Sequence, residues 1–494
     1  MYEQRVYNRQ VSPAQLSWKY ILALIVFLIL VLLATRTPFS QVTESTVTSG
    51  QDVTISKESE GRQGPDDAAR LTGESPLAET LPSPNPDKLT KVDYKPMLRE
   101  RLGGDRLPDD ADETPANPYD GNFMFGDWGS FRSKMAEKGV NVEFSFTQFG
   151  QILSWTKPDT FDYYANRFDL MVNVDTAKAG LWKGGGIGTH VETRFGGASA
   201  GIALYPANAA LITLTTGDAR VVVSSLYLTQ KLRKTSSIMF GKINTLDLLA
   251  AARFMGGRGI DGFMHIAFAG PPSGVAPVST YGALFSTRFK EKYGFSFYVF
   301  DPQDQTGWHE PFQKGVNFSP SFVIPGKTFG HNATHTIAAT FSTMEGTDLD
   351  DVPQVILPPG LQRIGTRRGS FNINYTYEQY FFRNPKNPAE GWGMFAKFAI
   401  ADGNPNILDN TLQVGIAGTA LIPSRKLDRF GVGIFSMDFS DALTDALRPL
   451  FTLRRERRLE AFYNFAVTRW LHITADIQVL PAAIEGRDTK VFGA

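Results

Sequence analysis

The stretch from Leu246 to Gly274 combines charged side chains with closely spaced glycines. Its members are Arg253, Arg258, Asp261 and His265, set among Gly256, Gly257, Gly259 and Gly262. The stretch is too long for a tight turn, and long loops without regular structure of their own are often functional. No Lys-Ser/Thr pair follows the glycines and no Rossmann spacing occurs, so this is not a phosphate-binding loop. Hydrogen bonding and ion pairing are the chemistry it offers.

A second polar group lies on an expected strand. Residues 187–195 alternate β-branched or aromatic side chains with His190, Glu192 and Arg194. Successive side chains of a strand face opposite sides, so these three share one face. Glu192 and Arg194 could form a local ion pair, and this structural role stays open beside a role in binding.

The composition excludes several function classes. Lysine plus arginine total 50 and aspartate plus glutamate total 50, which gives zero net charge. A nucleic-acid binder would show a basic excess or patch. The chain has no cysteine, which excludes a thiolate metal site, a catalytic thiol and a lipid-modified cysteine.

The N-terminus predicts export. Arg5, Arg9 and Lys19 precede an unbroken apolar run from Ile21 to Ala34. This run is shorter than the roughly 20 residues of a transmembrane helix, and a basic leader before a compact apolar stretch is typical of a signal peptide. We expect residues 1–40 to be a signal peptide or, alternatively, an uncleaved N-terminal anchor. Either way the rest of the chain leaves the cytoplasm.

Residues 41–121 differ in composition from the rest of the chain. They are rich in Thr, Ser, Glu and Gly, and prolines punctuate them from Pro76 to Pro118. Few apolar residues are available for burial, so we expect a disordered tether.

From Asn122 onward, strand patterns recur. In the first, Val140, Val142, Phe144 and Phe146 alternate with polar residues. Fourteen more candidates come after it: 168–174, 187–195, 226–232, 237–243, 281–289, 294–300, 316–323, 334–343, 370–380, 391–401, 411–421, 430–439, 459–467 and 471–480. Such a series suits a sandwich or a barrel.

Several features favour a membrane barrel over a soluble sandwich. The chain holds 37 phenylalanines and 16 tyrosines at an ordinary hydrophobic fraction, as expected where half of the strand residues face water. Exported single-chain barrels have an even number of strands. We therefore predict an all-β, antiparallel, up-and-down transmembrane β-barrel of about 16 strands over residues 122–494. The last strand would begin at Lys490 and is expected to be truncated at Ala494.

The chain resembles the carbohydrate-selective porins of the OprB family. The stretches that carry the resemblance are GDWGSFRSKMAEKG (126–139), FGKINTLDLLAAARFMGGRGIDGFM (240–264), GVNFSPSFVIP (315–325), NPAEGWGMFAKFAIADGNPN (387–406), DRFGVGIFSMDFSD (428–441) and ADIQVLPAA (475–483). They lie in order over roughly three quarters of the chain.

The resemblance implies a bacterial outer-membrane barrel with a water-filled pore for passive diffusion of sugars. Its partners would be carbohydrates and outer-membrane lipid, with no nucleic acid, and it would work as a monomer or a homotrimer. A sugar pore needs no catalytic residue, metal or cofactor, so the resemblance implies none. It needs mixed donors and acceptors that bind weakly. Presumed inner residues supply them: His190, Glu192, Arg194, Asn372, Asn374, Glu378, Lys397, Asn464, Asp476 and Gln478.

We expect selectivity to reside in the stretch from Leu246 to Gly274, with Arg253, Arg258 and Asp261 as candidate sugar contacts. In the alternative, Arg258 and Asp261 pair with each other and brace the loop against the barrel wall.

Two other functions remain open from the sequence. One is an envelope structural or adhesive protein anchored by the barrel. The other is an exported β-rich glycoside hydrolase, although its paired carboxylates are not evident among the scattered acidic residues.

Overall fold

The computed structural model describes residues 122–493 apart from several short gaps. The gaps are 154–160, 197–206, 212–219, 251, 271, 275, 291, 306–308, 357–364, 386, 388–389, 482 and 487–489. The predicted leader (1–40) and tether (41–121) lie outside the described residues.

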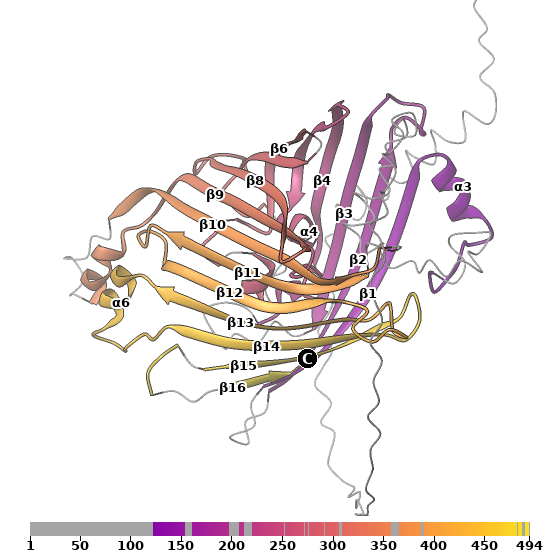
Figure 1. Cartoon of the computed structure of the whole chain (residues 1–494). Helices are drawn as coiled ribbons and strands as arrows, with labels where there is room; N and C mark the ends of the chain where they lie inside the picture. The colour runs from indigo at the N-terminus through magenta and orange to yellow at the C-terminus, as the bar shows by residue number, and fades with distance from the viewer. Residues whose placement is uncertain are drawn as a thin grey trace, which may run out of the picture. The chain divides into compact units, whose positions relative to one another are not determined.

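The strands of the described residues form a closed barrel in which each strand pairs antiparallel with its neighbours in sequence (Figure 1). They are β1 (Val140–Leu153), β2 (Phe161–Asp175), β3 (Gly185–Gly196), β4 (Arg220–Arg233), β5 (Ser236–Asn244), β6 (Ser279–Phe289), β7 (Tyr293–Phe300), β8 (Asn317–Thr328), β9 (His331–Thr347), β10 (Thr366–Arg383), β11 (Gly391–Ala401), β12 (Leu408–Thr419), β13 (Arg429–Phe439), β14 (Glu456–Ala466), β15 (His472–Leu480) and β16 (Lys490–Gly493). The fold prediction is confirmed.

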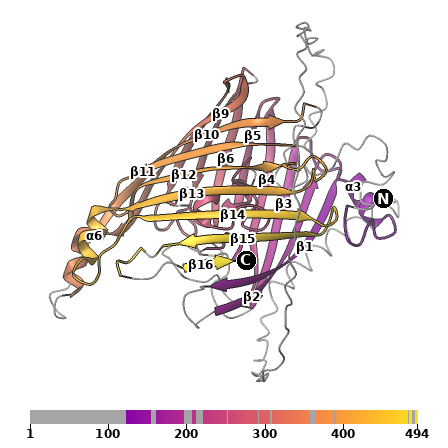
Figure 2. The ribbon, with the colours of Figure 1, turned by 60° about the horizontal axis from the view of Figure 1, so that its bottom comes forward.

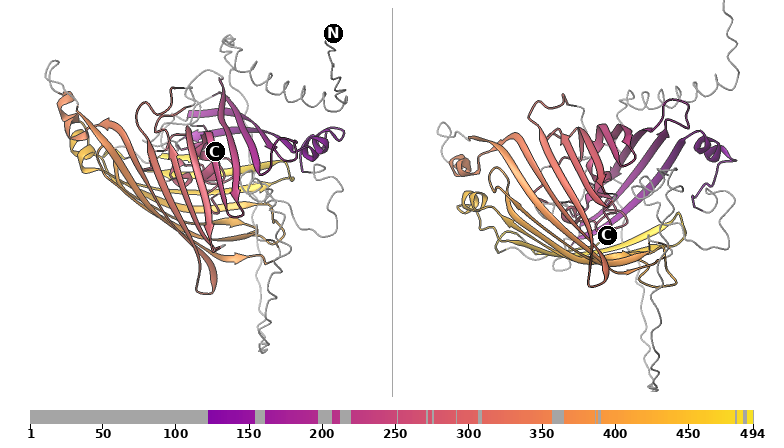
Figure 3. Two further views of the ribbon diagram at one scale, coloured as in Figure 1. Left: turned by 90° about the horizontal axis from the view of Figure 1, so that it is seen from above. Right: turned by 45° about the horizontal axis from the view of Figure 1, so that its top comes forward.

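The barrel closes between its first and last strands. β16 begins at Lys490, as predicted, and pairs with β15 on one side and with β1 on the other. The pairs with β1 are Ile152 with Gly493 and Leu153 with Phe492. These two pairs lie at the end of β1, and Val140 to Gln151 have no strand partner on that side among the described residues. In Figure 3 the colour runs around the wall from the first strands, in indigo, to the last, in yellow.

The alternating pattern of β1 separates its two faces as predicted. Phe144 and Phe146 are exposed on the outer surface. Ser145 pairs with Asp169, whose side chain is buried inside the barrel. Since side chains on neighbouring strands at paired positions share a face, Asn141, Glu143, Ser145 and Thr147 face the lumen, while Phe144 and Phe146 face outward. This is the arrangement of a membrane barrel.

The two ends of the barrel differ in their connections. At one end, here called the short-turn end, β4 joins β5 through residues 234–235 and β8 joins β9 through residues 329–330. At the other, the long-loop end, residues 245–278 connect β5 to β6, and residues 440–455 connect β13 to β14 through helix α6 (Asp441–Leu447). Helix α3 (Phe131–Glu137) precedes β1 at the end opposite α6 (Figure 2). No helix in the described part of the chain is long and apolar enough to cross a membrane.

Residues 245–278 fold back into the lumen as an inner segment. They contain helices α4 (Thr245–Ala250) and α5 (Ile266–Ala269). Phe263 and Phe268 stack on each other at 4.2 Å between ring centres and pack against Phe395 of β11 and Phe435 of β13. The inner segment therefore shares one hydrophobic core with this part of the wall.

Two glycines of β13 provide room for that packing. A Cβ atom on Gly431 would lie 2.4 Å from the Phe462 ring and 2.8 Å from the Phe263 ring. A Cβ atom on Gly433 would lie 2.7 Å from the Phe268 ring. Because such distances are below ordinary van der Waals contact, the glycines of the FGVG motif are needed where the inner segment lies against the wall.

Candidate functional site

The three polar residues predicted on β3 point into the barrel, where the structure buries them. His190, Glu192 and Arg194 are each less than a tenth exposed. Short inner segments cover this wall: residues 207–211, with the helical turn η3 (Ala209–Leu211), and helix α4. The prediction of inward orientation agrees with the structure, but these side chains contact other protein groups.

Arg167 of β2 organises the buried charges. Its guanidinium donates to both carboxylate oxygens of Asp169, at 2.8–3.0 Å, and lies 2.8 Å from Glu192 Oε2. It also donates to the carbonyl oxygen of Ala210 at 2.6 Å. Asn244 donates to the other oxygen of Glu192 at 3.1 Å. These bonds fix residues 207–211 to the wall.

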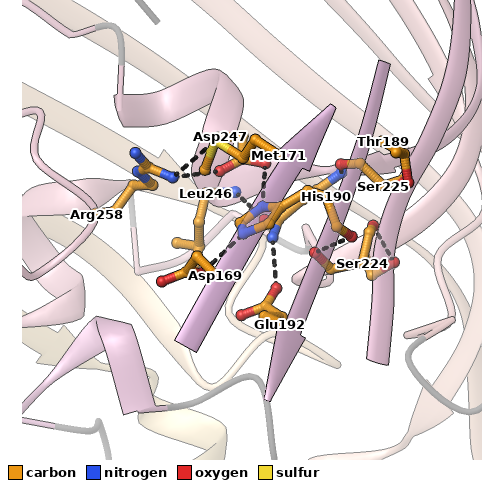
Figure 4. Close-up of polar contacts among 12 residues, drawn as sticks. Asp169, Met171, Thr189, His190, Glu192, Ser224, Ser225, Leu246, Asp247 and Arg258 are labelled. Atoms are coloured by element: carbon orange, nitrogen blue, oxygen red, sulfur yellow. Dashed lines mark hydrogen bonds and ion pairs between the residues drawn. The ribbon is translucent and has the colours of Figure 1, made fainter. Parts of the chain in front are cut away.

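His190 lies between two carboxylates (Figure 4). Its Nε2 atom is 2.7 Å from Asp169 Oδ1, and its Nδ1 atom is 2.7 Å from Asp247 Oδ2 in α4. A neutral imidazole donates through one nitrogen alone. Two ionised carboxylate partners therefore require the imidazolium form. Counted so, Arg167, His190 and Arg258 balance Asp169, Glu192 and Asp247 in a neutral network that joins β2, β3 and α4.

Asp169, His190 and Glu192 also lie close enough to one another, within 4.8 Å, to suit a metal ion. Arg167 places a fixed positive charge 2.8 Å from an oxygen of each carboxylate. A second cation between the same oxygens would be repelled. The geometry thus favours an ion-pair network over a metal site.

Arg258 and Asp261, predicted as sugar contacts, both hold the inner segment in place. Arg258 lies 3.4 Å from Asp247 and Asp261 lies 3.2 Å from Arg429 of β13. Burial acts to raise the pKa of Asp247, but attraction to His190 and Arg258 outweighs it and lowers that pKa. Each of the two thus has an ion-pair partner, Asp247 for Arg258 and Arg429 for Asp261, where the alternative expected them to pair with each other.

Arg253, the third candidate of this stretch, lies differently. It is exposed, and its guanidinium reaches across to β9, where it donates to Thr334 Oγ1 at 3.3 Å. Its Cζ atom lies 5.2 Å from the centre of the Tyr380 ring on β10. Arg253 therefore presents a charge and hydrogen-bond donors to the open part of the lumen.

The remaining predicted inner residues divide between buried and accessible positions. Asn372, Lys397, Asn464, Asp476 and Gln478 are buried. Asn374 and Glu378, both on β10, are half-buried. The accessible ones thus neighbour Arg253 on the same side of the barrel.

The prediction missed a wall of small polar side chains on the inner faces of β7 to β10. Register places them side by side: Ser296 opposite Ser321, and Thr340 and Thr336 of β9 opposite Asn372 and Thr376 of β10. We call half-buried Ser296, Ser319, Ser321, Thr336, Thr340, Asn374 and Thr376 the hydroxyl wall. Ser319 Oγ lies 3.1 Å from Thr340 Oγ1. The alternation of Ser and Thr in SPSFV and THTIAATFST could have identified these residues, but the predicted inner residues included Asn374 and none of the serines or threonines.

Comparisons with known proteins agree with this architecture. The model of the carbohydrate-selective porin, OprB family, matches residues 162–483. The high-pH structure of Pseudomonas putida OprB has a TM-score of 0.63 at 18% sequence identity, covering 75% of this chain and 96% of that chain. Its low-pH structure has a TM-score of 0.47 at 16% identity, with coverages of 75% and 96%. No match was found among the curated proteins.

The family match spans well over half of the chain, and the first of these structures shares its fold. The barrel, its polar lumen and its outward aromatic residues fit that assignment. The chain therefore belongs to the carbohydrate-selective porins of the OprB family, and it is a sugar diffusion channel of the bacterial outer membrane rather than an enzyme.

Proposed function

We propose that sugars cross this barrel along the hydroxyl wall of β7 to β10 and that Arg253 narrows the path. The observation that carries the proposal is the row of half-buried Ser, Thr and Asn side chains at facing register positions. Each hydroxyl both donates and accepts, as a sugar hydroxyl does. Uncharged groups bind weakly enough to release the solute, which conduction requires.

Inner segments cover several other parts of the wall. Helix α4 and residues 207–211 lie over the charged faces of β2 and β3. Phe263 and Phe268 lie over β11, β13 and β14. The path we propose is therefore off centre, between the inner segment and the hydroxyl wall.

Arg253 supplies the charged group that a sugar ring would meet beside the hydroxyl wall. Its guanidinium donates to ring hydroxyls, while Tyr380 is buried against Phe254 and lies beneath the Arg253 side chain. Glu378, half-buried on the same strand as Tyr380, adds an acceptor. His190, Glu192, Arg194, Arg258 and Asp261 act in this proposal by holding the inner segment.

Outer-membrane lipid would contact the outward residues, and the path lies inside a single barrel. The proposal therefore holds for a monomer and for a homotrimer alike. For the rest of the chain, we propose that residues 1–40 direct export and that residues 41–121 serve as a tether without a role in conduction.

Liposome swelling with purified, folded protein tests the proposal. Glucose, a disaccharide and a neutral amino acid of similar size to glucose would be compared. We expect faster entry of glucose than of the amino acid. Arg253→Ala should raise disaccharide entry severalfold, because it removes the side chain that spans the path. Arg457→Ala, on the outer face of β14 and exposed, is the matched control and should change nothing.

Equal entry of glucose and amino acid would contradict selectivity. Unchanged disaccharide entry in Arg253→Ala would show that the path runs elsewhere in the lumen. A folded protein that causes no swelling would contradict the proposed sugar path and favour the envelope structural role.

A further inference from the structure

The stretch GDWGSFRSKMAEKG, which carries part of the family resemblance, has no part in the channel. With the residues just before it, it forms a compact unit ahead of β1, here called the foot (residues 123–138). Arg132 is buried at its centre and donates to the carbonyl oxygens of Val142 at 3.1 Å and Gly126 at 3.4 Å. Asp127 accepts from the amide of Ser133 at 2.7 Å and from its hydroxyl at 2.6 Å. The foot is therefore held against the start of β1 in one conformation.

This ordered unit exposes large apolar side chains. Met124 is 64% exposed, Phe125 71%, Trp128 38% and Phe131 46%. Folding normally hides such residues, and a contiguous exposed apolar surface marks a site of interaction with a protein or a membrane.

The exposed rings continue the outer surface of the barrel. Trp128 lies 6.4 Å from Phe131 and 6.0 Å from Phe144, and Phe144 lies 5.8 Å from Phe168, measured between ring centres. Phe144 and Phe168 face outward on β1 and β2. A row of aromatic rings thus runs from the foot onto the lipid-facing wall.

Other strands carry exposed aromatic residues at the same level. The short-turn end has Trp182, Phe289, Tyr293, Phe329, Phe381, Phe382 and Trp470 exposed on or beside its turns. Val140, which comes directly after the foot and Gly139, pairs with Val174 next to the turn after β2, so the foot lies at this end. Girdles of aromatic residues mark both membrane interfaces of such barrels.

We propose that the foot is a membrane-interface anchor: Trp128 and Phe131 enter the lipid leaflet at the short-turn end, beside β1 and β2. Continuity with the outward rings and the shared level of the girdle favour lipid over a protein partner. Lys134, one turn after Phe131, and Lys138, directly after the helix, are exposed, and their ammonium groups suit anionic headgroups. The foot thus completes the aromatic girdle at the strands where the barrel begins.

The absence of cysteine allows a direct test with single nitroxide labels. The full chain would carry Phe131→Cys, Glu137→Cys or Phe146→Cys, each spin-labelled and folded into vesicles of phosphatidylcholine and phosphatidylglycerol. Glu137 is exposed on another side of α3 and is the matched control. Phe146 on the outer wall is the lipid reference. Collision with oxygen reports lipid, and collision with a water-soluble nickel complex reports water.

We expect the label at 131 to resemble that at 146, with an oxygen-to-nickel accessibility ratio severalfold above that at 137. A label at 131 as accessible to nickel as that at 137 would overturn the proposal. Strong dipolar coupling between labels at 131 on different copies would also overturn it, in favour of a protein interface. Sugar-driven swelling by each labelled protein confirms that it has folded. The accessibility ratios can therefore be interpreted whether or not sugars follow the proposed path.

Discussion

At the scale of single residues, His190 shows what a strand pattern can and cannot predict. Alternation placed His190, Glu192 and Arg194 on one inner face, and the structure agrees. The partners of His190 are Asp169 of β2 and Asp247, which lies 57 residues further along the chain. A partner at that separation leaves no periodic signal, so burial of these residues beneath α4 could not be predicted.

Replacing His190 by Gln should weaken the attachment of α4 to β3 and lower the stability of the folded barrel. Glutamine cannot supply a positive charge to Asp169 and Asp247, and breaking a buried ion pair costs about 3–5 kcal/mol. We expect the folded, heat-modifiable band on SDS gels to disappear at a lower temperature. His331→Gln, at an exposed position beside the turn after β8, is the control and should behave as the unaltered protein. Equal melting of the two variants would mean that the network contributes little.

The carboxyl group of Asp428 should make the stability of the barrel depend on pH. Burial acts to raise the pKa of its carboxyl, but the hydrogen bonds it accepts from Arg425, Tyr463 and the Ala466 amide outweigh burial and lower that pKa. A carboxyl with a lowered folded-state pKa contributes stability that is present above its unfolded pKa and is lost as pH falls through the folded one.

The barrel should therefore lose stability below about pH 4, near the unfolded pKa of Asp. Asp428→Asn should be less stable at neutral pH and show a shallower loss on acidification, measured as melting temperature against pH. Asp445→Asn removes an exposed ion pair with Arg448 and should leave the profile unchanged, because exposed pairs contribute little. An acid profile of Asp428→Asn identical to that of the parent would contradict this role.

At the scale of elements, the strands were predictable and the inner segment was not. All fifteen full strand candidates correspond to strands, because period-two alternation is a local property of the sequence. The inner segment gains its position from distant groups. Glu460 of β14, for example, accepts hydrogen bonds from the amides of Met264 and His265, 195 or more residues away.

Gly431 lets us test the contact between the inner segment and the wall. Gly431→Ala would place a methyl group against the rings of Phe462 and Phe263. Overpacking of this kind costs about 1–3 kcal/mol, and displacement of Phe263 should also alter the sugar swelling rates. Gly326→Ala, where a Cβ meets nothing within 4 Å, is the matched control. Equal stability and swelling in both variants would show that the segment does not depend on this contact.

At the scale of the whole molecule, we expect conduction to be independent of residues 41–121, the proposed tether. The hydroxyl wall and Arg253 belong to the barrel, while residues 41–121 precede it in sequence. Deletion of residues 45–115 should leave the swelling rates and sugar preference within experimental error of the full chain. The deletion combined with Arg253→Ala should show the same gain in disaccharide entry as Arg253→Ala alone. A loss of permeability on deletion would assign the tether a part in the channel.

The off-centre path also has an electrical consequence. Barrels of sixteen to eighteen strands enclose an aqueous channel, but here Phe263, Phe268 and α4 lie inside it, against β3, β11 and β13. On the proposed path, current carried by small ions follows the part of the lumen beside β7 to β10. Single-channel conductance in a planar bilayer should then be that of a narrower pore, and its ion selectivity should be slight, because serine and threonine hydroxyls line this path on one side.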